Sequence, residues 1–301
     1  MVLNNNIRAL VVTYNRKDYL AECIKAILNQ TIPVEKLYII DNNSNDGTQE
    51  YVESLLNKES KIKYIRLDKN LGGAGGFYEG IKAITKDTND GIVWLMDDDT
   101  IATDYTVEEF LNSKKVVEDN FSFIASTVVG ENNEAMNVPV ISNETDENGY
   151  KNWYKLLDHN MVKIKNATFV SLFIKIEAIK SVGLPRKDYF IWGDDTEYTQ
   201  RLVTKYGPAY LSGKSRVVHK RKNARTLSLL EEEIPGRIKL YLYYYRNMLT
   251  NLSLYESKKA VMKKTVRIVI ESYQLLFKRN VSYRVKKFSV MHKAVWAYYF
   301  K

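Results

Sequence analysis

The sequence predicts an α/β fold, with a doubly wound, largely parallel sheet followed by a helical C-terminal region. Short apolar runs alternate with helix-like segments through the first hundred residues, and beyond about residue 230 the apolar spacing is helical to the end. Helical segments that connect short apolar strands imply parallel strands with right-handed crossovers. We therefore expect two parts, residues 1–228 and residues 229–301.

The expected elements follow from the spacing of the apolar residues. Extended segments are expected at residues 7–12, 37–40, 62–67, 92–96 and 169–174, and helices at 19–28, 48–56, 77–86 and 196–203. Residues 131–150 are polar and lack periodicity. We expect a mobile surface loop there, which acts as a lid or contacts an acceptor.

Composition points to a globular protein. The chain has 301 residues, of which 45% are hydrophobic and 27% charged. No apolar stretch approaches the roughly 18 residues of a spanning helix, and the first residues lack the pattern of a signal peptide. We therefore expect a cytoplasmic protein. The single cysteine, Cys23, excludes an intramolecular disulfide and is expected in the core.

The net charge of +9 is unevenly distributed. Residues 214–301 hold 21 basic and 5 acidic residues, which leaves 24 basic and 31 acidic residues for positions 1–213. Such a basic tail suits an anionic membrane surface. The same field would attract nucleic acid, which we do not expect as the partner.

The segment 259–278 is amphipathic and basic. On a helical wheel its polar side holds Lys259, Lys263, Lys264, Arg267, Glu271, Gln274 and Lys278, and its apolar side Val261, Met262, Val266, Ile268, Val269, Tyr273 and Leu276. Ile270 and Phe277 are exceptions to this division, and Lys286, Lys287, Trp296, Tyr298 and Tyr299 continue the mixture of cations and aromatic rings. The pattern favours contact with a membrane interface, the alternative being a helix packed on the body with a solvated cationic face.

Three consecutive carboxylates, Asp97, Asp98 and Asp99, follow the apolar run 92–96. Ligands of open α/β sheets bind at the carboxyl ends of strands. Adjacent carboxylates raise each other's pKa unless a cation neutralises them, so the run predicts a site for Mn²⁺ or Mg²⁺. The alternative is a solvated acidic turn before a helix, with Thr106 and Glu109 as a capping box.

Polar or glycine residues also follow the other expected strands. They are Tyr14, Asn15 and Arg16, then Asp41, Asn42 and Asn43, then Asn70, Gly72, Gly73, Gly75 and Gly76. The glycine run does not fit the dinucleotide-binding pattern, because Tyr78 occupies the third glycine position. Placed before the helix 77–86, it would still let backbone N–H groups approach an anionic or sugar ligand, or it forms a tight turn.

A second acidic pair, Asp194 and Asp195, precedes the expected helix 196–203. A carboxylate at a helix start is often only a cap. However, transfer from a phosphate-activated donor needs a cation for the leaving group and a base for the attacking hydroxyl, and the chain offers one acidic cluster for each task. His219 ends a strand-like run and could supply an imidazole to the metal.

Together these residues resemble an inverting family 2 glycosyltransferase of the GT-A fold, and within it the galactofuranosyltransferase-like branch. The resemblance covers about residues 6–250 and rests on residues 12–16, 41–44, 70–77, 94–99, 192–198 and 244–247. It implies the GT-A nucleotide-diphospho-sugar transferase fold, which is Rossmann-like with a largely parallel sheet, and here carries a C-terminal helical extension.

The resemblance also implies site residues. Donor binding would fall to Thr13, Tyr14, Asn15, Arg16, Asp41, Asn70, Gly72, Gly73, Gly75, Gly76, Asp97 and Asp98. Asp97, Asp99 and His219 would hold Mn²⁺ or Mg²⁺. Asp195 would be the general base, with Asp194 as its rival. Trp192 and Glu197 would face the acceptor.

The implied reaction is a single displacement that inverts the anomeric centre. We expect transfer of galactofuranose from UDP-galactofuranose to a lipid-linked oligosaccharide, for bacterial surface polysaccharide, by an enzyme peripheral on the inner face of the cell membrane. A homo-oligomer is compatible with this expectation. The alternatives are a rhamnosyltransferase that uses dTDP-rhamnose, or a noncatalytic membrane- or RNA-binding protein with a degenerate GT-A fold.

Overall fold

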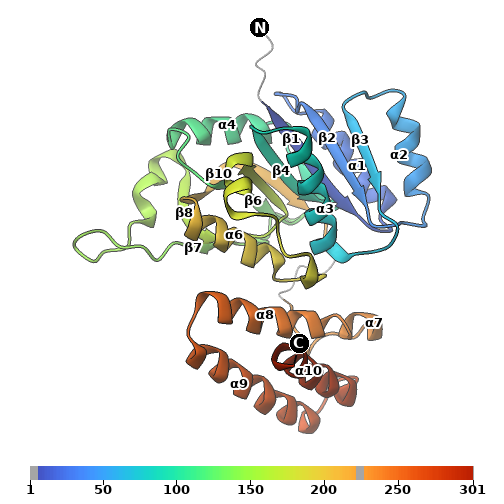
Figure 1. Cartoon of the computed structure of the whole chain (residues 1–301), viewed down its shortest axis with the longest axis vertical. Coiled ribbons are helices and arrows are strands. Elements are labelled where there is room, and N and C mark those ends of the chain that lie inside the picture. The colour runs from blue at the N-terminus through green and yellow to red at the C-terminus, as the bar shows by residue number, and fades with distance from the viewer. Residues whose placement is uncertain (1–5, 222–226, 301) are drawn as a thin grey trace. The chain divides into compact units, whose positions relative to one another are not determined.

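The computed structural model describes residues 6–221 and 227–300, which divide into two compact units (Figure 1). Unit 1 comprises the described residues of 1–187 and 195–224. Unit 2 comprises those of 188–194 and 225–301.

Unit 1 is built around one mixed sheet, to which ten strands of the described residues contribute. Its order is β3-β2-β1-β4-β9-β6-β10-β8-β7, and β5 pairs with β10. The strands are β1 (Ile7–Thr13), β2 (Lys36–Asp41), β3 (Ile62–Arg66), β4 (Ile92–Asp97), β5 (Thr100–Ala102), β6 (Phe123–Val129), β7 (Val140–Ile141), β8 (Met161–Asn166), β9 (Ser171–Lys175) and β10 (Ala209–His219).

The strands β3, β2, β1 and β4 are parallel, as predicted. Their register places Thr13 opposite Asp41, Asp41 opposite Arg66, and Val12 opposite Asp97. The carboxyl ends of these strands therefore meet at one edge of the sheet, which confirms the expected clustering of their polar residues. Beyond β4 the sheet changes character, because β9 runs antiparallel to both β4 and β6.

Helices cover both faces of the sheet (Figure 1). The side chains of β1 alternate accordingly: Ala9 and Val11 join the core under α1 (Lys17–Leu28), whereas Leu10 and Val12 join the core under α3 (Gly72–Asp87). The other helices of unit 1 are α2 (Thr48–Leu56), α4 (Thr106–Val116), α5 (Ile176–Val182), the 3₁₀ helix η1 (Trp153–His159) and α6 (Asp194–Lys205), of which Asp194 belongs to unit 2. The 3₁₀ helix η2 (Lys187–Tyr189) begins at the last residue before unit 2 and lies mostly in that unit.

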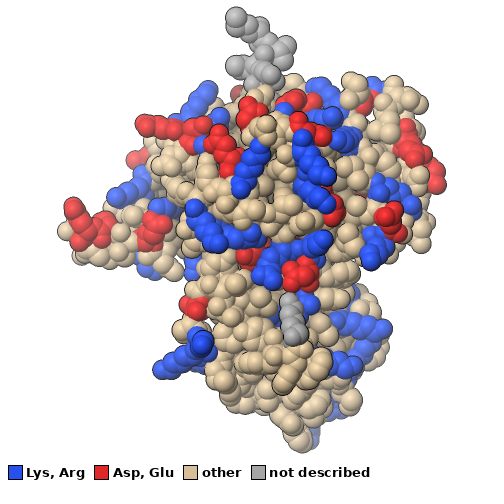
Figure 2. Space-filling view, viewed as in Figure 1, with Lys and Arg blue, Asp and Glu red and all other residues tan. Residues whose placement is uncertain are grey.

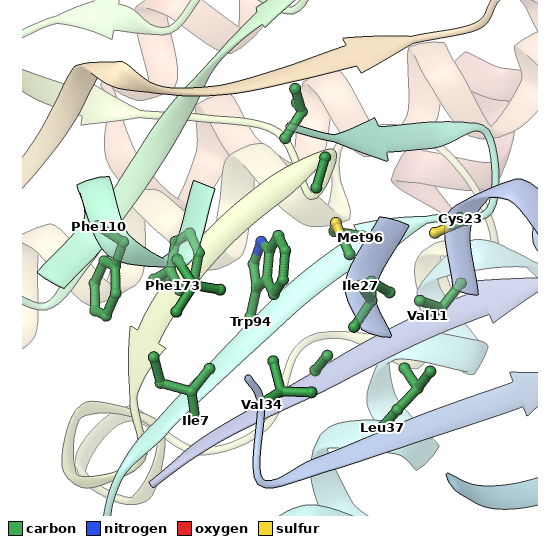
Figure 3. Packing of buried hydrophobic residues seen from close by; sticks show 14 of the residues in the cluster. Ile7, Val11, Cys23, Ile27, Val34, Leu37, Trp94, Met96, Phe110 and Phe173 are labelled. Carbon is green, nitrogen blue, oxygen red and sulfur yellow. The ribbon is translucent and has the colours of Figure 1, made fainter. Parts of the chain in front are cut away.

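Stacked aromatic rings hold β4 in place on one face of the sheet. Trp94 is fully buried and stacks on Phe173 at 4.9 Å between ring centroids, and Phe173 stacks on Phe110 at 4.1 Å (Figure 3). The indole N–H of Trp94 donates to Ser171 Oγ at 3.0 Å. Cys23 lies in the same core, as predicted. The strand that ends at Asp97 is thus fixed by packing as well as by its two neighbours.

The helix α3 begins at Gly72, so the glycine run lies inside the helix and not before it. The Asn70 Oδ1 atom accepts a hydrogen bond from the Gly72 N–H at 2.8 Å and so satisfies a donor of the first turn. A Cβ atom at Gly76 would lie 2.4 Å from Val12 Cγ1, whereas one at Gly73 would meet nothing within 4 Å. The missing side chain at Gly76 lets α3 approach β1.

Unit 2 is helical, with α7 (Pro235–Ile238), α8 (Tyr241–Tyr255), α9 (Lys258–Phe277) and α10 (Arg284–Tyr299). Its core consists of Leu229, Ile238, Tyr241, Leu249, Val261, Ile268, Leu275, Val290 and Met291. Lys287 is fully buried and donates to the Leu230 carbonyl at 2.9 Å, so it is not one of the exposed cations that the sequence suggested. Within the described residues, no helix is both long enough and apolar enough to cross a membrane.

The helix α9 has two apolar faces, whereas the helical wheel predicts a single apolar face. One face is buried and holds Val261, Ile268 and Leu275. The second face is exposed and consists of Met262, Val266, Ile270, Tyr273 and Phe277, which we call the exposed stripe of α9. Ile270 and Phe277, the exceptions on the wheel, belong to this stripe.

The contrast between two glycines of α3 gives a test of the packing. We expect Gly76→Ala to lower the free energy of unfolding by about 1–3 kcal/mol, because the added methyl group displaces the stiff Val12 side chain. Gly73→Ala is the matched control and should be neutral or stabilising by up to about 1 kcal/mol. Chemical denaturation measures both. Equal stability of the two variants would contradict the close approach of α3 to β1.

Candidate active site

The short strand β5 organises the acidic site, although no pattern of residues predicts this strand. It begins directly after the three aspartates and pairs antiparallel with β10, which places His219 opposite Thr100. The Lys220 N–H also donates to the Asp99 carbonyl at 2.8 Å. As a result, ligand atoms of Asp97, Asp99 and His219 all lie within 4.8 Å of one another.

Asp98 has a different position from its two neighbours. Its Oδ2 accepts from the Thr13 hydroxyl at 2.8 Å, and its Oδ1 lies 3.2 Å from Arg16 Nη1. The same guanidinium atom lies 2.5 Å from Asp99 Oδ2. Burial raises the pKa of Asp98 to about 6, while Arg16 opposes that rise. Asp98 therefore ties the end of β4 to the loop after β1.

The remaining carboxylate atoms suit a divalent cation. Burial and the charge of Asp99 raise the pKa of Asp97 to about 8. Asp99 Oδ1 is buried and has no hydrogen-bond partner among the described residues, although His219 Nε2 lies 3.0 Å away. Two carboxylates and an imidazole are common ligands of divalent metal ions. The residues thus fit such an ion.

The capping-box alternative is wrong. The Thr106 hydroxyl lies within hydrogen-bond distance of the carbonyl oxygens of Thr103 and Arg216, at 2.9 and 2.7 Å, and α4 has no side-chain cap. The aspartates are also not a solvated turn, because Asp98 and Asp99 are each only 4% exposed.

The loops after β1 and β2 are tied to each other. Asn15 Oδ1 accepts from the Asn45 N–H at 2.8 Å, and the Asn15 N–H donates to Ser44 Oγ at 2.9 Å. Asp41 is fully buried and accepts from the Ser44 N–H and the Tyr64 hydroxyl. Its contact with a nucleotide stays a prediction. Tyr14 is 44% exposed at the same edge.

The two aspartates of the second acidic pair, at the start of α6, differ in their exposure to solvent. Asp194 is only 6% exposed, whereas Asp195 is partly exposed and its Oδ1 accepts from the Thr196 N–H at 2.6 Å. Glu197, expected on the acceptor side, is buried in a bidentate ion pair with Arg201 at 3.0 and 2.9 Å. That pair gives Glu197 a structural contact, and its acceptor role stays a prediction.

The loop before α6, part of unit 2, has an unusual backbone. Phe190 and Trp192 have φ values of 64° and 62°, which bulky side chains rarely adopt. The Asn247 Nδ2 atom lies within hydrogen-bond distance of the carbonyl oxygens of Tyr189, Ile191 and Trp192, at 3.1, 3.2 and 2.8 Å. Asn247 belongs to the 244–247 motif that carried the resemblance, and this contact gives the motif a physical role.

The rings around Trp192 come from the same helix as Asn247. The centroids of Tyr241 and Tyr244 lie 5.1 and 6.3 Å from that of Trp192. Trp192 is therefore held by aromatic contacts within unit 2, and its stacking on an acceptor sugar stays a prediction.

The sequence does not predict one polar neighbour of the site, Asn137. Asn137 Oδ1 lies 2.9 Å from His219 Nδ1. Asn137 comes from residues 131–150, which contain the short strand β7 and are not wholly irregular. Nothing in the spacing of that polar segment could have singled it out, and the role of the segment as a lid stays a prediction.

The chain is similar in sequence to known proteins. Residues 9–173 match the model of the family described as glycosyl transferase family 2. Galactofuranosyltransferase GlfT1 of Mycolicibacterium smegmatis is 27% identical over 212 residues, which cover 65% of this chain and 64% of that protein. Poly-beta-1,6-N-acetyl-D-glucosamine synthase of Staphylococcus epidermidis is 27% identical over 111 residues, 36% of this chain and 26% of that protein. The matches thus span less than two thirds of the length of either relative.

Solved structures resemble the chain over most of its length. Mannosyltransferase PcManGT from Pyrobaculum calidifontis, in complex with GDP-Man and Mn²⁺, has a TM-score of 0.54 at 12% identity, covering 97% of this chain and 69% of its own. GalNAc-T7 with UDP, GalNAc and Mn²⁺ has a TM-score of 0.59 at 12% identity, covering 87% and 54%. At this identity the likeness shows the fold alone. Since the family model matches more than half of the 301 residues, this chain, which has the GT-A fold, belongs to glycosyl transferase family 2.

Proposed function

We propose that this protein is an inverting, metal-dependent galactofuranosyltransferase. It moves galactofuranose from UDP-galactofuranose to a hydroxyl group of a lipid-linked oligosaccharide in bacterial surface polysaccharide synthesis. The observation that carries the proposal is the cluster of Asp97, Asp99 and His219 at the end of β4. The 27% identity to a galactofuranosyltransferase supports the sugar, and neighbours solved with Mn²⁺ support the cation.

The donor half of the proposal rests on the edge of the sheet. Asp97, Asp99 and His219 would hold Mn²⁺ or Mg²⁺. Such an ion supplies positive charge that stabilises a departing nucleoside diphosphate. Arg16, whose side chain is 49% exposed, adds a second positive charge at the same edge. Gly73 in the first turn of α3 leaves open space beside the backbone, which suits a bulky donor.

The acceptor half rests on Asp195. A general base must reach the hydroxyl proton that it removes. Asp195 is partly exposed and oriented by the Thr196 N–H, whereas Asp194 is buried, so exposure favours Asp195 as the base. Direct attack by the acceptor hydroxyl on the anomeric carbon then inverts its configuration, and no covalent sugar–enzyme intermediate forms.

The same proposal places the enzyme at the cytoplasmic face of the cell membrane, with unit 2 on anionic lipid. The exposed stripe of α9 leaves five apolar side chains in solvent, and Phe277 is 82% exposed. Lys259 and Lys263 lie beside the stripe on the same helix. On the face of unit 2 that Figure 2 shows, basic side chains lie around a broad uncharged area. These cations suit anionic headgroups and would oppose the pairing of two such faces.

The metal and the donor can be tested together. We expect UDP release from UDP-galactofuranose only with Mn²⁺ or Mg²⁺, and a loss of turnover by about 10²–10³ in Asp99→Asn, because a ligand charge disappears. Glu53→Gln, an exposed change on α2, is the control and should keep full turnover. Release of dTDP from dTDP-rhamnose in place of UDP would overturn the sugar, and full turnover in a chelator would overturn the metal.

The two aspartates of α6 give a matched pair for the base. Asp195→Asn should lower turnover by about 10²–10⁴ and leave donor affinity unchanged, because only the proton acceptor is lost. Asp194→Asn should have a smaller effect on turnover. Steady-state kinetics and donor titration measure the two quantities. The opposite order of effects would assign the base to Asp194.

Binding to vesicles tests the exposed stripe of α9. Ile270→Glu should weaken binding to phosphatidylglycerol vesicles by about tenfold, because a charge replaces an apolar group that enters the interface. Added salt should weaken the binding of the unmodified chain. Leu254→Glu, an exposed apolar position on α8, is the control. Equal binding by Ile270→Glu and the unmodified chain in co-sedimentation would remove the stripe from the membrane contact.

A further inference from the structure

Asn137 is held beside His219 by a well-anchored turn. Residues 129 and 135 form an antiparallel bridge, and the Gly130 N–H donates to the Glu134 carbonyl at 2.8 Å. Met136 is only 6% exposed and packs in the core of unit 1. The next residue, Asn137, has a φ of 48°, in the left-handed region that asparagine tolerates better than most residues. Its side chain is thus placed from a fixed backbone.

This contact bears on which ring nitrogen of His219 carries the proton. An amide oxygen only accepts hydrogen bonds. With Asn137 Oδ1 at 2.9 Å, Nδ1 of His219 is placed to donate a hydrogen bond, and a neutral ring that donates there presents a lone pair at Nε2.

The other ring nitrogen, Nε2, faces a carboxylate. Nε2 lies 3.0 Å from Asp99 Oδ1, a buried oxygen that has no hydrogen-bond partner among the described residues. This contact is favourable only when a proton or a cation lies between the two atoms, because two lone pairs at this distance repel. A cation bound to both atoms would turn the repulsion into ligation.

We propose that Asn137 is a positioning residue that holds His219 in its Nδ1–H tautomer, so that Nε2 is a ready ligand for a divalent cation. The inference rests on the metal site of the proposed function, and not on the identity of the sugar or of the acceptor. It also gives the 131–150 segment a role at the site that the sequence did not indicate.

The tautomer can be measured without metal. In ¹⁵N-labelled full-length protein at about pH 8.5, above the ordinary histidine pKa, long-range ¹H–¹⁵N spectra report the tautomer of each of the three histidines. A His219→Gln variant assigns the His219 signals. We expect the Nδ1–H form in the unmodified chain, and a shift toward Nε2–H in Asn137→Ala, where Asp99 Oδ1 becomes the remaining acceptor.

A neighbouring asparagine provides the control. Asn133 lies in the same turn, and its Oδ1 accepts from Arg216 Nη2 at 2.9 Å. Asn133→Ala should leave the His219 tautomer unchanged. An Nε2–H tautomer in the unmodified chain would overturn the proposal, because the Asn137 amide would then donate to Nδ1. An unchanged spectrum in Asn137→Ala would also overturn it, because Asn137 would then have no influence on the tautomer.

Cation affinity is the second readout. Titration of the metal-free chain with Mn²⁺, followed by electron paramagnetic resonance of the free ion, should show binding about 10- to 100-fold weaker in Asn137→Ala. Asn137→Asp keeps an oxygen acceptor and should retain affinity, as should Asn133→Ala. Unchanged affinity in Asn137→Ala, or no binding by the unmodified chain, would overturn the role. Normal Mn²⁺ binding without sugar transfer would support it and count against the proposed donor or acceptor instead.

Discussion

Three adjacent carboxylates at the end of a buried strand are the constraint on which this site depends. Buried charges are costly unless each finds a partner. Thr13, at the end of β1, and Arg16, in the loop after it, contact Asp98, and His219, at the end of β10, contacts Asp99. These partners come from separate strands, so both the parallel register of β1 with β4 and the antiparallel register of β5 with β10 are needed. A one-residue slip in either would leave a buried carboxylate without its partner.

The packing that fixes β4 and β1 matters as much for the site as the side chains that pair with the carboxylates. The stack of Trp94, Phe173 and Phe110 fixes β4, and the close approach of α3 at Gly76 fixes β1. A site on packed strands keeps its ligands in place even when no ion balances their charge. Packing in the hydrophobic core stabilises β4 and offsets the repulsion among the three carboxylates. The end of this strand can therefore be acidic and still be ordered.

The parallel half of the fold and its acidic edge could be predicted, because apolar spacing and strand ends are local signals. Four features could not. β5 has only three residues and shows no periodicity. The glycines of α3 argue against a helix by propensity, yet the hydrogen bond from the Gly72 N–H to Asn70 Oδ1 and the close approach to Val12 outweigh that tendency. A helical wheel is read with a single apolar face in mind, whereas α9 has one apolar face buried in the helical unit and a second one exposed to solvent. Asn137 reaches His219 through tertiary contacts alone.

The loop before α6 shows how far a positioning contact can act along the chain. Positive φ values at Phe190 and Trp192 cost about 1–3 kcal/mol each, and such strain persists only where the surroundings enforce it. Here Asn247 and Asn251 bind the carbonyl groups of the loop from α8, within unit 2. The loop leads directly into Asp194 and Asp195, so these amides fix how the chain enters α6. Asn247 therefore fixes the backbone of unit 2 just before α6, and the proposed base Asp195 follows that backbone in the sequence.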